Sequence, residues 1–338
     1  MKENRDFTVI VSVSELLVSN PDKLKEIDSS GNCIYRLNGA HFEIDTCKGV
    51  LRDLRNILNK PRIMLDLPGN KVRLKGLSEP IRLIKGEVFE LHDYLVNYPK
   101  LYAHLKRGDS ILTNDSTFTL EVMEIEGTTI RMQSNSDGIL QNKKGLHVKD
   151  AYRNMPFVLP KDLDFIKFSC QEDIDYVSLS YVRSGQDIRE IKKMLTDHGN
   201  TRIQIFAKVE TLSAVENLDN ILEEVDNINI DRGDLSADVG MLKLWGFQEE
   251  VVRTAIKARK NVFLATQFLK NMEKEPVPLI AEVLDLTNTI KMGISGIQLS
   301  EETAVGKYPV ECVKLVFDVY EQFIGQKESY CENEQTIS

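Results

Sequence analysis

The chain has 338 residues and a net charge of −9, and its five cysteines show no metal-ligand spacing. This length predicts one large domain with an insertion, and the acidic balance argues against a nucleic-acid partner. No apolar run approaches the roughly 20 residues that a membrane helix needs, and the first residues carry no secretory signal. We therefore expect no membrane partner, reduced thiols and a cytoplasmic location.

Eight short apolar runs alternate with helical segments outside one insertion. Buried parallel strands have this pattern, and eight strand–helix units close into an α/β fold, the (β/α)8 TIM barrel. An open doubly wound sheet is the alternative, although no glycine-rich phosphate loop follows a strand. The predicted strands are Thr8–Val13, Cys33–Asn38, Arg62–Leu67, Asp175–Ser180, Ile203–Glu210, a run ending before Arg232, Asn261–Thr266 and Gly296–Ser300.

The insertion, residues 75–154, has short β-branched or alternating runs with turn signals between them. This pattern predicts a small all-β domain after the third strand. The barrel then comprises residues 1–74 and 155–325, and residues 326–338 form a polar tail without periodicity. The insertion's predicted strands are Ile81–Ile84, Val88–Leu91, Ser110–Thr113, Phe118–Met123 and Thr128–Met132. The predicted helices are Pro21–Ile27, Ile44–Leu58, Pro160–Phe168, Gln186–His198, Phe247–Arg259, Pro278–Met292 and Pro309–Phe323.

Ionisable residues follow two neighbouring predicted strands. Lys208 and Glu210 end the fifth strand, and Asp234 follows the sixth. Because the carboxyl ends of parallel strands meet at one end of a barrel, both carboxylates can share a pocket. Carboxylate oxygens suit Mg²⁺ or Mn²⁺, so we predict a divalent-metal site with Lys208 beside it. A strand-end ion pair is the alternative interpretation of Lys208 and Glu210.

Polar residues also follow the other predicted strands. A single loop residue of this kind is usually solvated or caps a helix, but their concentration at one end of a barrel indicates an active site. These residues are Arg36, Asn38 and His41 after strand two, Asp66, Lys71 and Arg73 after strand three, Ser180 after strand four, Thr266 after strand seven, and Glu301 and Glu302 after strand eight.

Four blocks of these residues resemble the pyruvate kinase family. They are Ala-Lys-Val-Glu at 207–210, Asp-Arg-Gly-Asp-Leu at 231–235, Ala-Thr-Gln-Phe-Leu at 265–269 and Leu-Ser-Glu-Glu-Thr-Ala-x-Gly-x-Tyr-Pro at 299–309. Their joint order is more specific than any one block, and the resemblance covers about residues 8–323. It implies a metal-bearing barrel with a β-rich lid, which we assign to the insertion.

The resemblance implies transfer of the phosphoryl group of phosphoenolpyruvate to ADP, yielding pyruvate and ATP, with Mg²⁺ or Mn²⁺. Lys208 and Arg36 would stabilise the transferred group, and Thr266 would lie on the proton-relay side; a helix N-cap is the alternative for Thr266. Lys143 and Lys144 would bind nucleotide or form an exposed hairpin end. The implied substrate-binding residues are Arg36, Ser180, Lys208, Gly233, Asp234 and Thr266, and the implied nucleotide-binding residues are Asn38, His41, Arg73, Lys143 and Lys144.

Several positions depart from the family pattern. Most members hold a potassium ion with oxygen side chains, but two of these positions are Ala40 and Leu67 here, and a usual glutamate is Lys71. Potassium-independent members share this Leu and Lys combination, so we expect Lys71 to replace the ion. The nucleotide side has drifted, with Glu15 and Glu301 adding negative charge.

The chain ends after the last barrel helix, whereas the family normally carries a further domain for sugar-phosphate activators. We therefore expect no such allostery, and a homodimer is possible. Two other functions stay open: a metal-dependent pyruvate-enolate lyase, aldolase or decarboxylase, and a non-catalytic relative. A lyase does not require a lid or ADP, so the lid and the paired lysines favour the kinase.

Overall fold

Eight parallel strands form a closed barrel in the computed structural model, which describes residues 7–98, 100–113, 118–148 and 151–336. The first strand, β1, pairs with both β2 and β15, which closes the barrel and rules out the open sheet. The predicted (β/α)8 TIM barrel is therefore confirmed. In sequence order its strands are β1 (Thr8–Val13), β2 (Cys33–Asn38), β3 (Ile63–Asp66), β11 (Tyr176–Leu179), β12 (Gln204–Val209), β13 (Asn227–Asp231), β14 (Asn261–Ala265) and β15 (Gly296–Leu299).

The barrel strands are buried on both faces, which is why they read as continuous apolar runs. Their outward side chains join the main core beneath the helices. A second, smaller cluster fills the barrel interior and consists of Ile10, Ile34, Met64, Phe206 and Phe263. The interior is thus a packed core, which leaves only the two ends of the barrel for a site.

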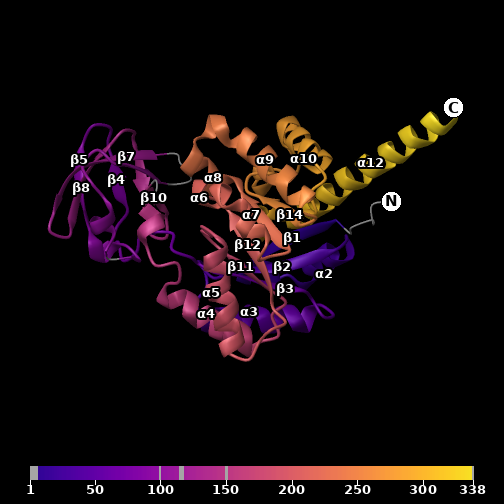
Figure 1. The fold of residues 1–338 in the computed structure, drawn as a ribbon, viewed down its shortest axis with the longest axis horizontal. Helices are drawn as coiled ribbons and strands as arrows, with labels where there is room; N and C mark the ends of the chain where they lie inside the picture. The colour runs from indigo at the N-terminus through magenta and orange to yellow at the C-terminus, as the bar shows by residue number, and fades with distance from the viewer. Residues whose placement is uncertain (1–6, 99, 114–117, 149–150, 337–338) are drawn as a thin grey trace.

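The longer helices surround the barrel and match the predicted ones (Figure 1). Short helices α1, α8 and α11, which follow β1, β13 and β15, were not predicted. The last helix continues past its predicted end at Phe323 and through most of the predicted tail, where Glu, Gln and Lys favour helix. The α-helices are α1 (Glu15–Val18), α2 (Pro21–Ser29), α3 (Ile44–Ile57), α4 (Pro160–Gln171), α5 (Gly185–Asp197), α6 (Leu212–Glu216), α7 (Leu218–Leu222), α8 (Arg232–Val239), α9 (Leu244–Lys257), α10 (Ile280–Lys291), α11 (Glu301–Ala304) and α12 (Pro309–Thr336).

Two antiparallel sheets lie between β3 and β11, beside the barrel (Figure 1). One has five strands in the order β10-β6-β7-β8-β5, and the other pairs β4 with β9. They enclose a separate apolar core. All five predicted strands are present, whereas β9 and β10 were missed. The strands are β4 (Ile81–Leu83), β5 (Val88–His92), β6 (Ser110–Thr113), β7 (Phe118–Glu126), β8 (Thr129–Ser134), β9 (Gly138–Leu140) and β10 (Leu146–Val148).

Five short 3-10 helices are also present among the described residues. None of the helices described has the length and apolar character to span a bilayer. The exact limits of the lid domain, residues 75 and 154, stay a prediction. The 3-10 helices are η1 (Asp93–Leu95), η2 (Leu101–His104), η3 (Ala151–Asn154), η4 (Met241–Lys243) and η5 (Lys270–Glu273).

Candidate active site

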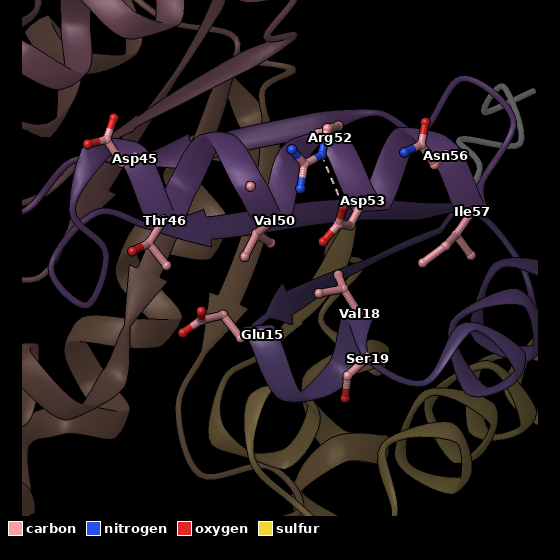
Figure 2. A pocket seen from close by; sticks show the side chains of 11 residues that line it. Glu15, Val18, Ser19, Asp45, Thr46, Val50, Arg52, Asp53, Asn56 and Ile57 are labelled. Atoms are coloured by element: carbon pink, nitrogen blue, oxygen red, sulfur yellow. Dashed lines mark hydrogen bonds and ion pairs between the residues drawn. The ribbon is translucent and has the colours of Figure 1, made fainter.

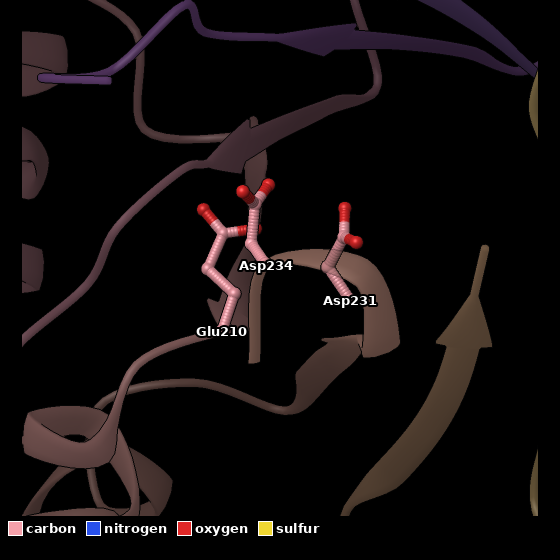
Figure 3. A group of neighbouring side chains, drawn as sticks. All are labelled: Glu210, Asp231 and Asp234. Carbon is pink, nitrogen blue, oxygen red and sulfur yellow. The ribbon is translucent and has the colours of Figure 1, made fainter. Parts of the chain in front are cut away.

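Three carboxylates meet at the mouth of the barrel. Glu210 follows β12, Asp231 ends β13, and Asp234 lies in the first turn of α8. One oxygen of each lies within 4.8 Å of the others, and Figure 3 shows all three side chains pointing to the same side. Glu210 and Asp234 thus come together as expected. Asp231 was not predicted as a third carboxylate of the site. Its position at the carboxyl end of β13, the strand that Asp234 follows, could have indicated it.

Lys208 is buried in the midst of these acids. Its Nζ lies 3.0 Å from Glu210 Oε2, 3.4 Å from Asp231 Oδ2 and 3.9 Å from Asp66 Oδ2. Burial alone would lower the pKa of Lys208, but the three carboxylates outweigh it and raise the pKa above its usual value. The side chain therefore stays a cation in the metal-free protein.

Glu210 has one oxygen available for a cation. Its Oε1 accepts a 2.6 Å hydrogen bond from the backbone N–H of Tyr181, whereas the buried Oε2 has no hydrogen-bond donor among the described residues. Lys208 faces Oε2 as an ion-pair partner, but without hydrogen-bond geometry. Burial raises the pKa of Glu210 to about 7; Lys208 opposes this rise, and Asp234 and Asp231 add to it.

Asp234 is held by donors from two other segments. Its Oδ1 accepts hydrogen bonds from Lys71 Nζ and, at 3.1 Å, from Tyr181 Oη. Burial opposes ionisation of Asp234, but Lys71 and Lys208 lower its pKa well below the usual range. The structure thus places the Lys71 ammonium against a candidate metal ligand, a contact that the sequence did not predict.

Arg36 and Ser180 flank the cluster. Arg36 Nε donates to Asp66 Oδ2 at 2.7 Å, and Nη1 donates to Ser12 Oγ at 2.8 Å. Ser180 Oγ accepts from Lys208 Nζ at 3.3 Å. Although burial opposes ionisation, Lys208 and Arg36 lower the pKa of Asp66. Asp66 therefore connects the two predicted catalytic cations through one carboxylate.

Thr266 leaves β14 with a left-handed backbone, φ 83°. Its hydroxyl donates to Asp231 Oδ1 at 2.6 Å, and its carbonyl oxygen accepts from Arg232 Nη2 at 2.7 Å. No helix begins at the next residue in the described chain, so the N-cap alternative does not hold. A side-chain carbon at Gly233 would lie 3.0 Å from Thr266 Cγ2, so a larger residue there would require Thr266 to shift by a few tenths of an ångström.

Comparison with known proteins gives the family of this arrangement. The family model for the barrel domain of pyruvate kinase matches residues 7–313. The chain belongs to the pyruvate kinase family. The resemblance stated from the sequence and the kinship with pyruvate kinase-like phosphotransferases are thereby confirmed.

Relatives named pyruvate kinase are about 30% identical to the chain over the aligned residues. Identity is 29% over 320 residues with the Borreliella burgdorferi protein, covering 92% of this chain and 67% of that one. It is 32% with the Thermotoga maritima protein, covering 87% and 66%, and 31% with the Clostridium acetobutylicum protein, covering 86% and 66%. The chain therefore spans about two thirds of the length of these curated relatives.

The predicted nucleotide residues of this pyruvate kinase relative gather less tightly. Burial lowers the pKa of His41, with the nearby charges of Arg73, Arg36 and Lys143 adding to it and Glu301 opposing it. Lys143 is exposed in a turn that pairs with Leu74. The structure thus gathers these charges around His41 and agrees with an exposed turn at Lys143.

Asn38 and Lys144, two of the predicted nucleotide-binding residues, each accept a hydrogen bond from a backbone N–H group. Asn38 Oδ1 accepts from the backbone N–H of Ala40 at 3.1 Å, so the side chain stabilises its own turn. Lys144 is half-buried, and its carbonyl oxygen accepts from the backbone N–H of Leu74 at 2.9 Å. Neither contact identifies a ligand, and the nucleotide-binding role of both residues stays a prediction.

A cavity of about 640 Å³ lies outside the barrel mouth, between α1 and α3 (Figure 2). Glu15 and Val18 line it from α1, and Asp45 and Asp53 line it from α3. Among the described residues, none of those predicted to bind metal, substrate or nucleotide lines this cavity. This cavity therefore does not mark the candidate active site. The site is recognised instead by its cluster of buried charged side chains.

Proposed function

We propose that the chain transfers the phosphoryl group of phosphoenolpyruvate to ADP, with a divalent cation held by Glu210, Asp231 and Asp234. The observation that carries this proposal is the buried Lys208 ammonium beside three convergent carboxylates. The family membership supports it, because the relatives carry the name pyruvate kinase.

The donor set fits Mg²⁺ or Mn²⁺. Both ions prefer oxygen ligands and keep open positions for substrate and water. Glu210 Oε2 is a buried carboxylate oxygen that faces the Lys208 ammonium at 3.0 Å but has no hydrogen-bond donor in the described chain, so it would also contact a bound cation. When bound, the ion would offset negative charge on the substrate oxygens.

Lys208 and Arg36 supply fixed positive charge on the chain itself. Both side chains are buried, at 6% and 7% exposure, so their charges act with little screening by water. A phosphoryl group in transfer spreads negative charge over its oxygens, and preorganised cations stabilise that charge. We assign this role to Lys208, with Arg36 oriented by Asp66.

Thr266 and Asp231 are placed to handle a proton. Phosphoryl transfer leaves the enolate of pyruvate, which takes up one proton at carbon to give the product. A threonine hydroxyl is too weak an acid to act alone. Its 2.6 Å hydrogen bond to Asp231 orients it, and we infer that water behind Thr266 supplies the proton.

The test is a coupled assay of pyruvate formation from phosphoenolpyruvate and ADP with Mg²⁺. We expect turnover in the wild type and a loss of at least about a hundredfold in Lys208→Met, the scale for removing a preorganised donor. Lys192→Met, which removes an exposed lysine on α5, is the matched control and should retain full activity. Equal rates for wild type and Lys208→Met would indicate a contaminant, and an inactive wild type would refute the proposal.

Calorimetric titration with Mg-ADP separates the kinase from the enolate lyase. A kinase must bind the nucleotide, whereas a lyase needs only the metal, pyruvate and a carbonyl substrate. We expect saturable binding that is weakened in Arg73→Met. No heat of binding, combined with pyruvate release from oxaloacetate, would favour the lyase.

We also propose that activity does not depend on potassium. The positions that lack oxygen side chains, Ala40 and Leu67, leave too few ligands for that ion, and Lys71 brings an ammonium into the site. Replacing sodium by potassium in the assay should change the rate less than about twofold. Lys71→Glu should make the rate potassium-dependent. A strong rate increase in the wild type would contradict this proposal.

A further inference from the structure

Tyr181 occupies an unusual place directly after β11. Its backbone is left-handed, φ 57°, a conformation that is rare for a bulky residue and costs roughly 1–3 kcal/mol. The side chain is 3% exposed. Such strain persists only where surrounding contacts hold it, and here those contacts are with the candidate metal ligands.

Tyr181 donates to two of the three carboxylates. Its backbone N–H donates to Glu210 Oε1 at 2.6 Å, and its hydroxyl donates to Asp234 Oδ1 at 3.1 Å. The other donor to Asp234, Lys71 Nζ, also contacts Oδ1. Both contacts therefore occupy one oxygen of each carboxylate. They leave Asp234 Oδ2 for a cation, and Glu210 Oε2, which faces the Lys208 ammonium at 3.0 Å, for a cation beside that ammonium.

We propose that Tyr181 is a positioning residue that presets Glu210 and Asp234 for a divalent cation, a role that rests on the metal site proposed above. The left-handed backbone lets one residue hold both ligands, because it turns the N–H toward β12 while the ring extends toward α8. Hydrogen bonds to metal-ligating carboxylates fix the orientation of the ligand oxygens and raise metal affinity.

The ring and its hydroxyl are held in this role by their surroundings. Tyr152 packs edge-on against Tyr181, with ring centroids 5.9 Å apart and an interplanar angle of 67°. The packing keeps the ring in place while its hydroxyl donates to Asp234 Oδ1.

The test is Tyr181→Phe, which removes the hydroxyl and keeps the ring and the backbone N–H. Titration calorimetry with Mn²⁺ alone is expected to show affinity about tenfold weaker than in the wild type, the scale for losing a partner of a metal ligand. Thermal unfolding without metal should change little. Asp234→Asn should lose binding entirely.

Tyr35→Phe is the matched control. The Tyr35 hydroxyl also donates to a carboxylate, Asp28 Oδ1 at 2.7 Å, on a buried ring away from the site. Its loss should lower the melting temperature and leave Mn²⁺ affinity unchanged. Wild-type affinity in Tyr181→Phe, with binding lost in Asp234→Asn, would overturn the role of Tyr181 alone. No Mn²⁺ binding by the wild type would overturn the proposed metal site and this role together.

Discussion

Three of the six described non-glycine residues with positive φ follow barrel strands. Tyr181, Thr266 and Gln267 have φ values of 57°, 83° and 57° although none is glycine. Each such conformation costs roughly 1–3 kcal/mol, and local contacts must offset it. Arg232 does so at Thr266, because its guanidinium binds the Thr266 carbonyl oxygen while stacking 3.9 Å from the Phe268 ring centroid.

The protonation of Glu210 predicts a pH dependence of metal binding. Its pKa in the metal-free protein is about 7, and only the ionised carboxylate binds a cation, so metal must displace a proton below that pH. Mn²⁺ affinity should fall about tenfold between pH 8 and pH 6. Calorimetry in buffers of different ionisation enthalpy would measure the released proton. An affinity that is constant over this range would contradict the prediction.

The strands that close the barrel leave no space for a side chain at Gly296. Gly296 begins β15, which lies between β1 and β14. A side-chain carbon there would lie 2.0 Å from the Thr8 carbonyl oxygen and 2.7 Å from Phe263. The close approach of backbone to backbone therefore depends on glycine at this position.

Gly296→Ala should destabilise the protein by about 2 kcal/mol or more, since overpacking a core typically costs roughly 1–3 kcal/mol. Gly49→Ala is the matched substitution, and we expect it to increase the free energy of unfolding. Gly49 lies within α3, and an added methyl group meets nothing within 4 Å, so better helix propensity should stabilise by about 0.5–1 kcal/mol. Urea unfolding midpoints would measure both. A neutral Gly296→Ala would show that the barrel closes less tightly.

At the scale of the whole molecule, α8 connects the lid to the site. Its first turn carries Asp234, which accepts a hydrogen bond from Lys71. One turn later Asp238 accepts from Tyr152 Oη at 3.0 Å and faces His147 Nε2 of β10 at 3.3 Å. Asp238 also accepts from the backbone N–H of Leu212 at 2.6 Å. The helix that bears a candidate metal ligand thus also contacts the lid through Asp238.

His147→Ala should loosen the lid from the barrel. The ring is buried between the two, and its loss removes the partner that faces Oδ1 of the buried Asp238. Small-angle X-ray scattering should report a larger radius of gyration, as expected for hinge opening. His92→Ala is the control, because His92 contacts Thr129 within the lid. An unchanged scattering profile would show that other contacts hold the lid.

The barrel and much of its mouth could be predicted because their signals are local. Burial on both faces makes each strand an apolar run, and parallel strands all leave the barrel at the same end. Lys208, Glu210 and Asp234 were therefore expected together and are found together. The missed strands β9 and β10 have only three residues each. The strand β4 is equally short, but the sequence shows a four-residue apolar run there, Ile81–Ile84, which was enough to predict it.

The sequence by itself thus determined the barrel, its strand ends and the kinds of groups gathered there. Only the tertiary structure decided which atoms meet. Lys71 and Asp234 are 163 residues apart, and Tyr181 holds Glu210 and Asp234 through a left-handed backbone that no pattern indicates. The physical reason is that periodicity assigns a residue to a face or an end, whereas a hydrogen bond between loops depends on how the barrel closes and how each side chain turns.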